Sequence, residues 1–79
     1  MHWVVYMLEC ADGSLYTGIT TNLDRRLVAH AAGKGARYMK GCGPFRLVYR
    51  ETCQSRAEVS RRETAIKSLD WAKKRQLFS

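Results

Sequence analysis

Two polar residues with the chemistry to act on one ligand stand on the first predicted helix. Arg26 and His30 lie four residues apart, so both side chains project from the same side of the helix, next to its apolar positions. They could act on one ligand together. Alternatively, both could simply be solvated at the edge of the apolar stripe.

A carboxylate stands on the apolar face of a later predicted helix. At 100° per residue Glu63 lies about 40° from Val59, which is the centre of that face. An unpaired buried carboxylate is costly, so Glu63 should have a cation beside it. That cation is either a metal ion or an arginine, for which the candidates are Arg26, Arg46 and Arg62.

Two tyrosines and a glycine lie on a predicted hairpin, and their arrangement depends on its register. With a two-residue loop, Tyr6 and Tyr16 lie on opposite faces. With a three-residue loop that ends in a left-handed Gly13, Tyr6 pairs with Gly18 and both phenols share one face. Gly18 would then leave an open space beside Tyr6 where a phosphodiester could approach. The alternative is that both tyrosines are ordinary strand aromatics.

Local patterns predict the elements that would position these residues. Residues rich in β-branched and aromatic types predict strands over 2–9 and 14–19, and Asp12-Gly13 between them is typical of a hairpin turn. Asn22 is a good N-cap for a helix that runs to about Ala32, with Gly33 as a natural stop.

The second half of the chain begins with a loop over 33–44, which holds four glycines and the only proline. Alternating apolar and charged residues predict a strand over 45–51, and the capping box at 55–58 opens a second helix. A short third helix is predicted over 69–78. The order β-β-α-β-α-α favours an α+β fold with a small antiparallel three-stranded sheet flanked by helices.

The length of the chain predicts one small domain over residues 1–79. Because 46% of the residues are apolar, this domain can bury a core. Fourteen Lys and Arg against seven Asp and Glu give a net charge of +7, which favours a polyanionic partner. The alternative is a solvated basic surface with no partner. The cations that we expect to contact phosphate are Lys34, Arg37, Lys40, Lys73, Lys74 and Arg75.

The three cysteines, Cys10, Cys42 and Cys53, are odd in number and lack a metal-binding spacing. We expect them to be reduced and partly buried. No stretch approaches the roughly 20 apolar residues of a membrane span, and the first residues lack the features of a signal peptide. We therefore expect a soluble, cytoplasmic protein.

Nearly the whole chain resembles the GIY-YIG nuclease superfamily, and most closely its small stand-alone bacterial members that consist of the domain alone. Val4-Val5-Tyr6 stands in place of Gly-Ile-Tyr, and Tyr16-Thr17-Gly18 in place of Tyr-Ile-Gly. Arg26 and His30 follow the glycine at the offsets of the family's helix. Glu63 matches the family's metal-binding glutamate.

The resemblance implies that five residues are catalytic: Tyr6, Tyr16, Arg26, His30 and Glu63. The three-residue hairpin loop and the place of Glu63 on the apolar face of its helix predict that the five line one concave face. Glu63 would hold one Mg²⁺ or Mn²⁺, and Arg26 would grip the scissile phosphate. Tyr6 would be the general base, with its pKa lowered from near 10 by Arg26 and the metal. Tyr16 would orient water or phosphate. His30 would either bond Tyr6 or position the phosphate.

Two functions from different classes follow. The first is a metal-dependent endonuclease that hydrolyses phosphodiester bonds in DNA, with structure-selective or weak sequence selectivity, in repair or processing. The alternative is a non-catalytic nucleic-acid-binding module. Many catalytic members use an asparagine near the carboxyl end, whereas the only asparagine here is Asn22. We expect DNA rather than RNA as partner, no membrane, and an unknown protein that could supply targeting.

Overall fold

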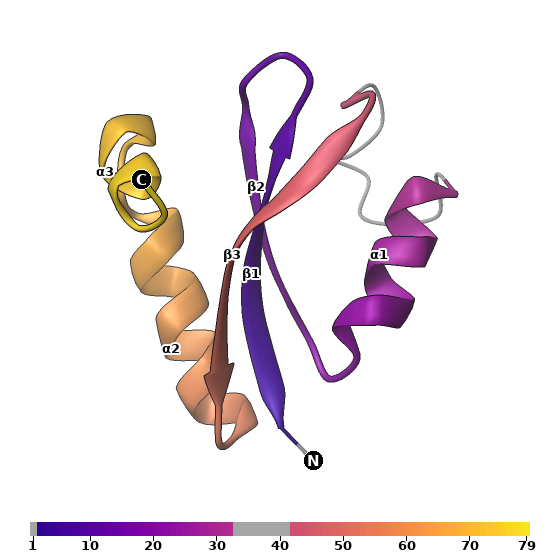
Figure 1. The fold of residues 1–79 in the computed structure, drawn as a ribbon. Helices are drawn as coiled ribbons and strands as arrows, with labels where there is room; N and C mark the ends of the chain where they lie inside the picture. Colours follow the sequence, from indigo (N-terminus) through magenta and orange to yellow (C-terminus); the bar gives the residue numbers. More distant parts are fainter. Residues whose placement is uncertain (1, 33–41) are drawn as a thin grey trace.

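The computed structural model describes residues 2–32 and 42–79. In chain order its elements are β1 (Trp3–Cys10), β2 (Leu15–Thr20), α1 (Leu23–Ala31), β3 (Phe45–Cys53), α2 (Arg56–Lys67) and α3 (Trp71–Gln76), as Figure 1 shows. The strands form one antiparallel sheet in the order β2-β1-β3. This confirms the predicted α+β class and the order β-β-α-β-α-α. No helix in the described ranges combines the length and apolar character needed to cross a membrane.

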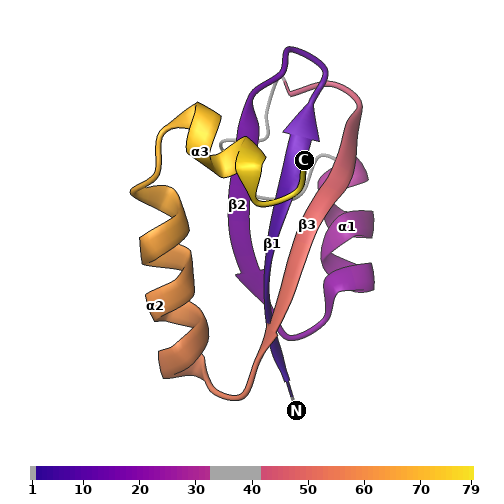
Figure 2. The same cartoon turned by 60° about the vertical axis from the view of Figure 1, so that its left-hand side comes forward.

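Helices cover both faces of the sheet, with α1 on one side and α2 and α3 on the other (Figures 1 and 2). Successive side chains of the central strand β1 point to opposite faces, so each face has its own buried cluster. The cluster toward α1 comprises Val4, Tyr6, Leu8 and Leu23. The cluster toward α2 comprises Val5, Met7, Cys53, Val59 and Ile66.

The β1–β2 hairpin turns through a three-residue loop that ends in Gly13, whose φ is +86°. The N–H of Gly13 donates to the carbonyl of Cys10 at 2.9 Å. Tyr6 consequently pairs with Gly18, and Leu8 pairs with Tyr16. This is the second of the two registers considered from the sequence, and it places both tyrosines toward α1.

The caps that were expected from the sequence fix where two helices begin. The Asn22 side chain accepts a hydrogen bond from the N–H of Arg25 at 3.0 Å, and the Ser55 hydroxyl accepts one from Glu58 at 3.1 Å. The Glu58 carboxylate in turn accepts from the N–H of Gln54 at 2.7 Å. Because a cap sets the first helical residue, it also decides which side chains of α1 and α2 face the sheet.

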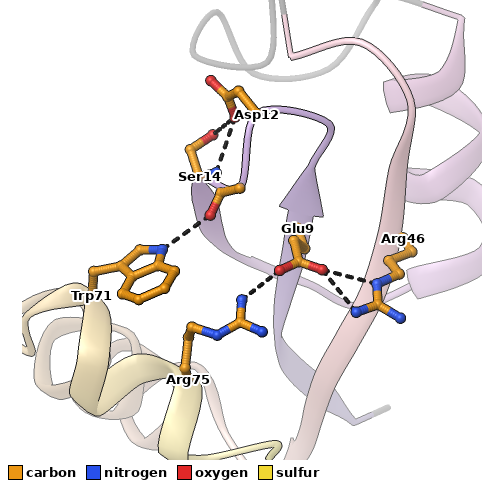
Figure 3. Close-up of polar contacts among 7 residues, drawn as sticks. Glu9, Asp12, Ser14, Arg46, Trp71 and Arg75 are labelled. Carbon is orange, nitrogen blue, oxygen red and sulfur yellow. Dashed lines mark hydrogen bonds and ion pairs between the residues drawn. The ribbon is translucent and has the colours of Figure 1, made fainter.

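Helix α3 is fastened to the hairpin by two side chains (Figure 3). The Trp71 indole N–H donates to the carbonyl of Gly13 at 3.0 Å. The Arg75 guanidinium binds the Glu9 carboxylate, which also pairs with Arg46 at 2.8 Å. A six-residue helix is unstable alone, so these contacts hold α3 in place.

Cys10 and Cys42 are joined by a disulfide, so the expectation that all three cysteines are reduced is wrong. The end of β1 lies beside the segment that leads into β3, where the N–H of Ala11 donates to the carbonyl of Cys42 at 3.3 Å. The two cysteines are 32 residues apart in sequence, and no local pattern indicates this contact. Cys53 is free and buried, as expected.

Candidate active site

Tyr6 lies in a buried aromatic cluster on the α1 side of the sheet. Its hydroxyl oxygen is 2.9 Å from Nε2 of His30, within hydrogen-bond distance. The ring centroid of Tyr16 is 6.3 Å from that of Tyr6 and 5.5 Å from that of His30. Phe45 covers His30 edge-on at 6.2 Å. The sheet and α1 thus bring three of the five predicted catalytic residues into contact.

Gly18 provides the space for the Tyr6 ring. A Cβ at this position would lie 2.7 Å from the Tyr6 hydroxyl oxygen, 2.8 Å from its Cζ and 3.0 Å from Cε2 of Tyr16. The prediction that Gly18 leaves room for a phosphodiester is therefore wrong, because the phenol of Tyr6 already fills that space. The missing side chain instead lets Tyr6 cross the neighbouring strand and reach His30.

His30 is buried, whereas Arg26, one turn earlier on α1, is exposed. The interpretation in which both are solvated is therefore wrong for His30. Burial, and secondarily the positive charge of Arg26, lower the pKa of His30 below its usual value of 6.5. The imidazole is neutral at neutral pH. Its Nδ1 is buried without a hydrogen-bond partner among the described residues, while Nε2 faces the Tyr6 hydroxyl.

The pKa of the Tyr6 hydroxyl is raised well above its usual value of 10.0, first by burial and then by the neighbouring Tyr16. The charge of Arg26 lowers this pKa, as expected, but burial outweighs that effect. Tyr6 is therefore a phenol at neutral pH in the protein alone. Because His30 beside it is neutral, the imidazole can accept the proton of the phenol.

Glu63 approaches the aromatic cluster from the other side of the sheet. It lies on α2 between Val59 and Ile66, which are both fully buried. Its carboxylate is close enough to raise the pKa of Tyr6 electrostatically. Arg26, on α1, has the opposite electrostatic effect and lowers the pKa of Tyr6, so the phenol is influenced by one cation and one carboxylate. Whether all five residues line one concave face stays a prediction.

The cation beside Glu63 is Lys67, one turn later on α2, at 3.1 Å. Two of the arginines considered as partners bind other carboxylates: Arg62 pairs with Glu51 at 2.9 Å, and Arg46 pairs with Glu9. Sequence reasoning missed Lys67 as the partner, although its spacing of four residues from Glu63 is the signal that could have found it.

A single carboxylate is the donor that the cluster offers to a metal ion. Within residues 2–32 and 42–79, no three His, Cys, Asp or Glu side chains gather into a group that could hold a metal. The Glu63 side chain is 23% exposed, so its oxygens can be reached from solvent. A hard oxygen donor of this kind fits Mg²⁺ or Mn²⁺, with water and phosphate oxygens completing the coordination.

The cations that were expected to contact phosphate are in different situations. Lys34, Arg37 and Lys40 lie outside the described residues. Arg75 shares the Glu9 carboxylate with Arg46, so its charge is partly compensated. Lys73 and Lys74 have no ion-pair partner in the described part of the chain, and Lys74 lines a cavity together with Tyr16 and Lys67.

Known proteins resemble this chain over almost its full length. The model of the GIY-YIG catalytic domain matches residues 2–76. A UPF0213 protein of Desulfotalea psychrophila is 57% identical over 76 residues, which are 95% of this chain and 69% of the relative.

Two solved structures are also similar. The solution NMR structure of a UPF0213 protein from Bacillus halodurans is 53% identical, with a TM-score of 0.63, and the match covers 98% of this chain and 82% of that one. The solution NMR structure of a protein from E. faecalis is 35% identical, with a TM-score of 0.68, and the match covers 98% and 83%.

Proposed function

The chain belongs to the GIY-YIG catalytic domain family, and on that premise we propose that it is a metal-dependent endonuclease that hydrolyses phosphodiester bonds in DNA. The observation that carries the proposal is the 2.9 Å approach of the Tyr6 hydroxyl to Nε2 of a buried, neutral His30. Such a pair supplies the proton acceptor that hydrolysis by water requires.

The Tyr6–His30 pair would activate the attacking water by two proton transfers. The Tyr6 oxygen takes a proton from water while the Tyr6 proton passes to Nε2 of His30, so the phenol need not ionise at its raised pKa. This path uses the tautomer that carries its hydrogen on Nδ1. The hydroxide forms a bond to phosphorus and the bond to the 3′ oxygen breaks. The leaving oxygen then takes a proton from water.

The other three candidates divide the remaining work. Arg26, exposed beside the cluster, binds the scissile phosphate and offsets its developing charge. Tyr16 orients the water or the phosphate by hydrogen bonding. Glu63 would hold Mg²⁺ or Mn²⁺, which when bound stabilises charge on the leaving 3′ oxygen.

We propose structure-selective or weakly sequence-selective cleavage, in DNA repair or processing, by a single domain over residues 1–79 in the cytoplasm. A domain of this size has little surface for reading base edges, which supports weak sequence selectivity. A protein partner could supply targeting.

A non-catalytic nucleic-acid-binding module is the second candidate. The ion pair between Lys67 and Glu63 favours it, because an ammonium already neutralises the proposed metal-binding carboxylate. The only asparagine, Asn22, caps α1 and so does not replace the carboxyl-terminal asparagine of many catalytic relatives.

Both candidate functions predict nucleic-acid binding, so only cleavage distinguishes the nuclease from the binding module. Purified protein is incubated with plasmid, single-stranded DNA and RNA, in Mg²⁺, in Mn²⁺ and in a chelator. The nuclease proposal expects DNA to be cut with metal, and expects the chelator and the Glu63→Ala change to abolish cutting. Binding without cutting in every condition would favour the binding module.

A further inference from the structure

A small cavity lies at the edge of the sheet, where β2 meets the end of α2 and the start of α3. Its volume is about 260 Å³, and its lining residues are Leu15, Tyr16, Thr17, Lys67 and Lys74. Pockets that enclose drug-sized ligands measure roughly 300–1,000 Å³. This cavity therefore suits a small chemical group rather than a whole nucleotide.

The charged residues of the lining are both cations. Lys67 comes from α2 and Lys74 from α3, and no carboxylate lines the cavity in the part of the chain that the structure describes. Lys74 has no ion-pair partner among those residues, and the partner of Lys67, Glu63, lies outside the lining. Because Lys67 is paired with Glu63, the lining carries one uncompensated ammonium, that of Lys74, which favours an anion.

Thr17 adds a hydroxyl whose hydrogen-bonding capacity is unused. Its residue is 4% exposed, and its Oγ1 is buried without a hydrogen-bond partner among the described residues. Leaving a buried hydroxyl unpaired is destabilising, so such a group calls for an explanation. An oxygen of a phosphate held by Lys74 could accept a hydrogen bond from this hydroxyl.

The helix backbone that carries Lys74 is held in place before any ligand binds. Trp71 and Arg75, on either side of it on α3, bind Gly13 and Glu9 of the hairpin (Figure 3). The helix that carries the cation is thus held against the sheet that carries Thr17. Because the helix is already docked, only the Lys74 side chain has to become ordered when a ligand binds.

We propose that this cavity binds one backbone phosphate of the nucleic-acid strand, next to the phosphate that is cut. The assignment rests on the proposed function, and Tyr16 supports it because this residue both lines the cavity and contacts Tyr6 and His30. A strand passing along the edge of β2 would place successive phosphates at the two sites.

Binding of a single-stranded oligonucleotide, measured in chelator over a series of salt concentrations, tests the proposal. Lys74→Gln is compared with Arg61→Gln, which also removes one positive charge, from an exposed residue of α2 that does not line the cavity. Each phosphate contact to a single strand contributes about 0.7 to the slope of log affinity against log salt. We expect Lys74→Gln to weaken binding and reduce that slope by about 0.7, and Arg61→Gln to leave the slope unchanged. Equal effects of the two changes would overturn the assignment.

Thr17→Val is the second variant, because it replaces the hydroxyl with a methyl group of similar size. Since this hydroxyl has no partner, the melting temperature should stay the same or rise, while oligonucleotide affinity falls. A lower melting temperature with unchanged affinity would assign the hydroxyl a purely structural role and contradict its part in the subsite.

Inorganic phosphate distinguishes the strand from a free anion. NMR titrations of the wild-type protein follow the amide signals of Thr17 and Lys74. We expect the oligonucleotide to shift them at far lower concentration than inorganic phosphate. Tighter binding of inorganic phosphate would overturn the strand assignment. These binding measurements contain chelator, so they test the subsite separately from cutting. If the protein cuts no DNA but Lys74→Gln still reduces the salt slope, the proposed nuclease function is contradicted and the phosphate subsite is supported.

Discussion

Glu63→Gln separates chemistry from folding, because the partner of Glu63 is a solvent-exposed lysine. The side chains of Lys67 and Glu63 are 55% and 23% exposed, and pairs of this kind one helical turn apart contribute about 0.3–0.5 kcal/mol. In a domain of this size 1 kcal/mol shifts the melting temperature by roughly 4–8 °C. The expected decrease is therefore about 1–4 °C. A buried arginine partner would instead have made the change cost about 3–5 kcal/mol.

Glu51→Gln is a matched control, because Glu51 is a carboxylate on β3 whose hydrogen bonds have a structural role. It accepts hydrogen bonds from Nε and Nη2 of Arg62 at 2.9 and 3.1 Å, and from the Tyr49 hydroxyl at 2.7 Å. Bonds to charged groups contribute roughly 1.5–3 kcal/mol each, but this pair is about a third exposed, so about 1–2 kcal/mol in total is expected. The melting temperature should fall by roughly 4–16 °C, with cutting retained.

Thermal melts by circular dichroism and plasmid cleavage in Mg²⁺, run on both variants, give opposite results if the reasoning holds. Glu63→Gln should melt close to the wild type and fail to cut. Glu51→Gln should melt earlier and still cut. A large fall in the melting temperature of Glu63→Gln would make its role structural, and an unchanged melt with undiminished cutting would remove Glu63 from the mechanism.

Three further predictions concern packing, pH and salt. Gly18→Ala places a Cβ 2.7 Å from the Tyr6 hydroxyl, so the ring must move away from His30. We expect roughly 1–3 kcal/mol of destabilisation in a thermal melt, together with a loss of cutting; an unchanged melt would contradict the packing. The pKa of His30 is lowered in the folded protein, whereas in the unfolded chain it has its ordinary value of 6.5. Below pH 6.5 the unfolded chain therefore binds more protons at His30 than the folded protein does. Stability should therefore decline as the pH falls from 6.5 through the folded pKa, and melts at a series of pH values should show a smaller decline in His30→Gln. Finally, nucleic-acid affinity should fall steeply with salt, and binding that does not change between dilute and physiological buffer would argue against phosphate contacts.

The sequence predicted most of the fold because its signals are local. Asn22 and Ser55 accept the capping hydrogen bonds that their types suggest, and the left-handed Gly13 selects the hairpin register. That register then places Tyr6 and Tyr16 on one face. The buried position of His30 follows from where α1 begins, because the first helical residue after the Asn22 cap decides which side chains of the helix face the sheet.

Features that depend on contacts between distant segments could not be predicted. The strict alternation expected for 45–51 breaks at a register shift between Met7 and Leu8 of β1. As a result Phe45 packs toward α1, whereas Val48 and Tyr49 pack toward α2, and the strand continues to Cys53.

The electrostatics of Tyr6 and Glu63 also lay beyond sequence patterns. Spacing shows that Arg26 can lie near Tyr6, but the pKa of the phenol is set mainly by how deeply the fold buries it. Similarly, the partner of Glu63 depends on which arginines are already bound to other carboxylates, as Arg62 is to Glu51.

The most direct test of the account is the single-turnover rate of DNA cleavage by Tyr6→Phe at saturating metal. The change removes only the hydroxyl oxygen that lies 2.9 Å from Nε2 of His30. General acid–base catalysis contributes roughly 10²–10⁴-fold, so the rate should fall by at least about 100-fold while oligonucleotide binding is retained. Cleavage by Tyr6→Phe at the wild-type rate would contradict the proposal that the Tyr6–His30 pair activates water.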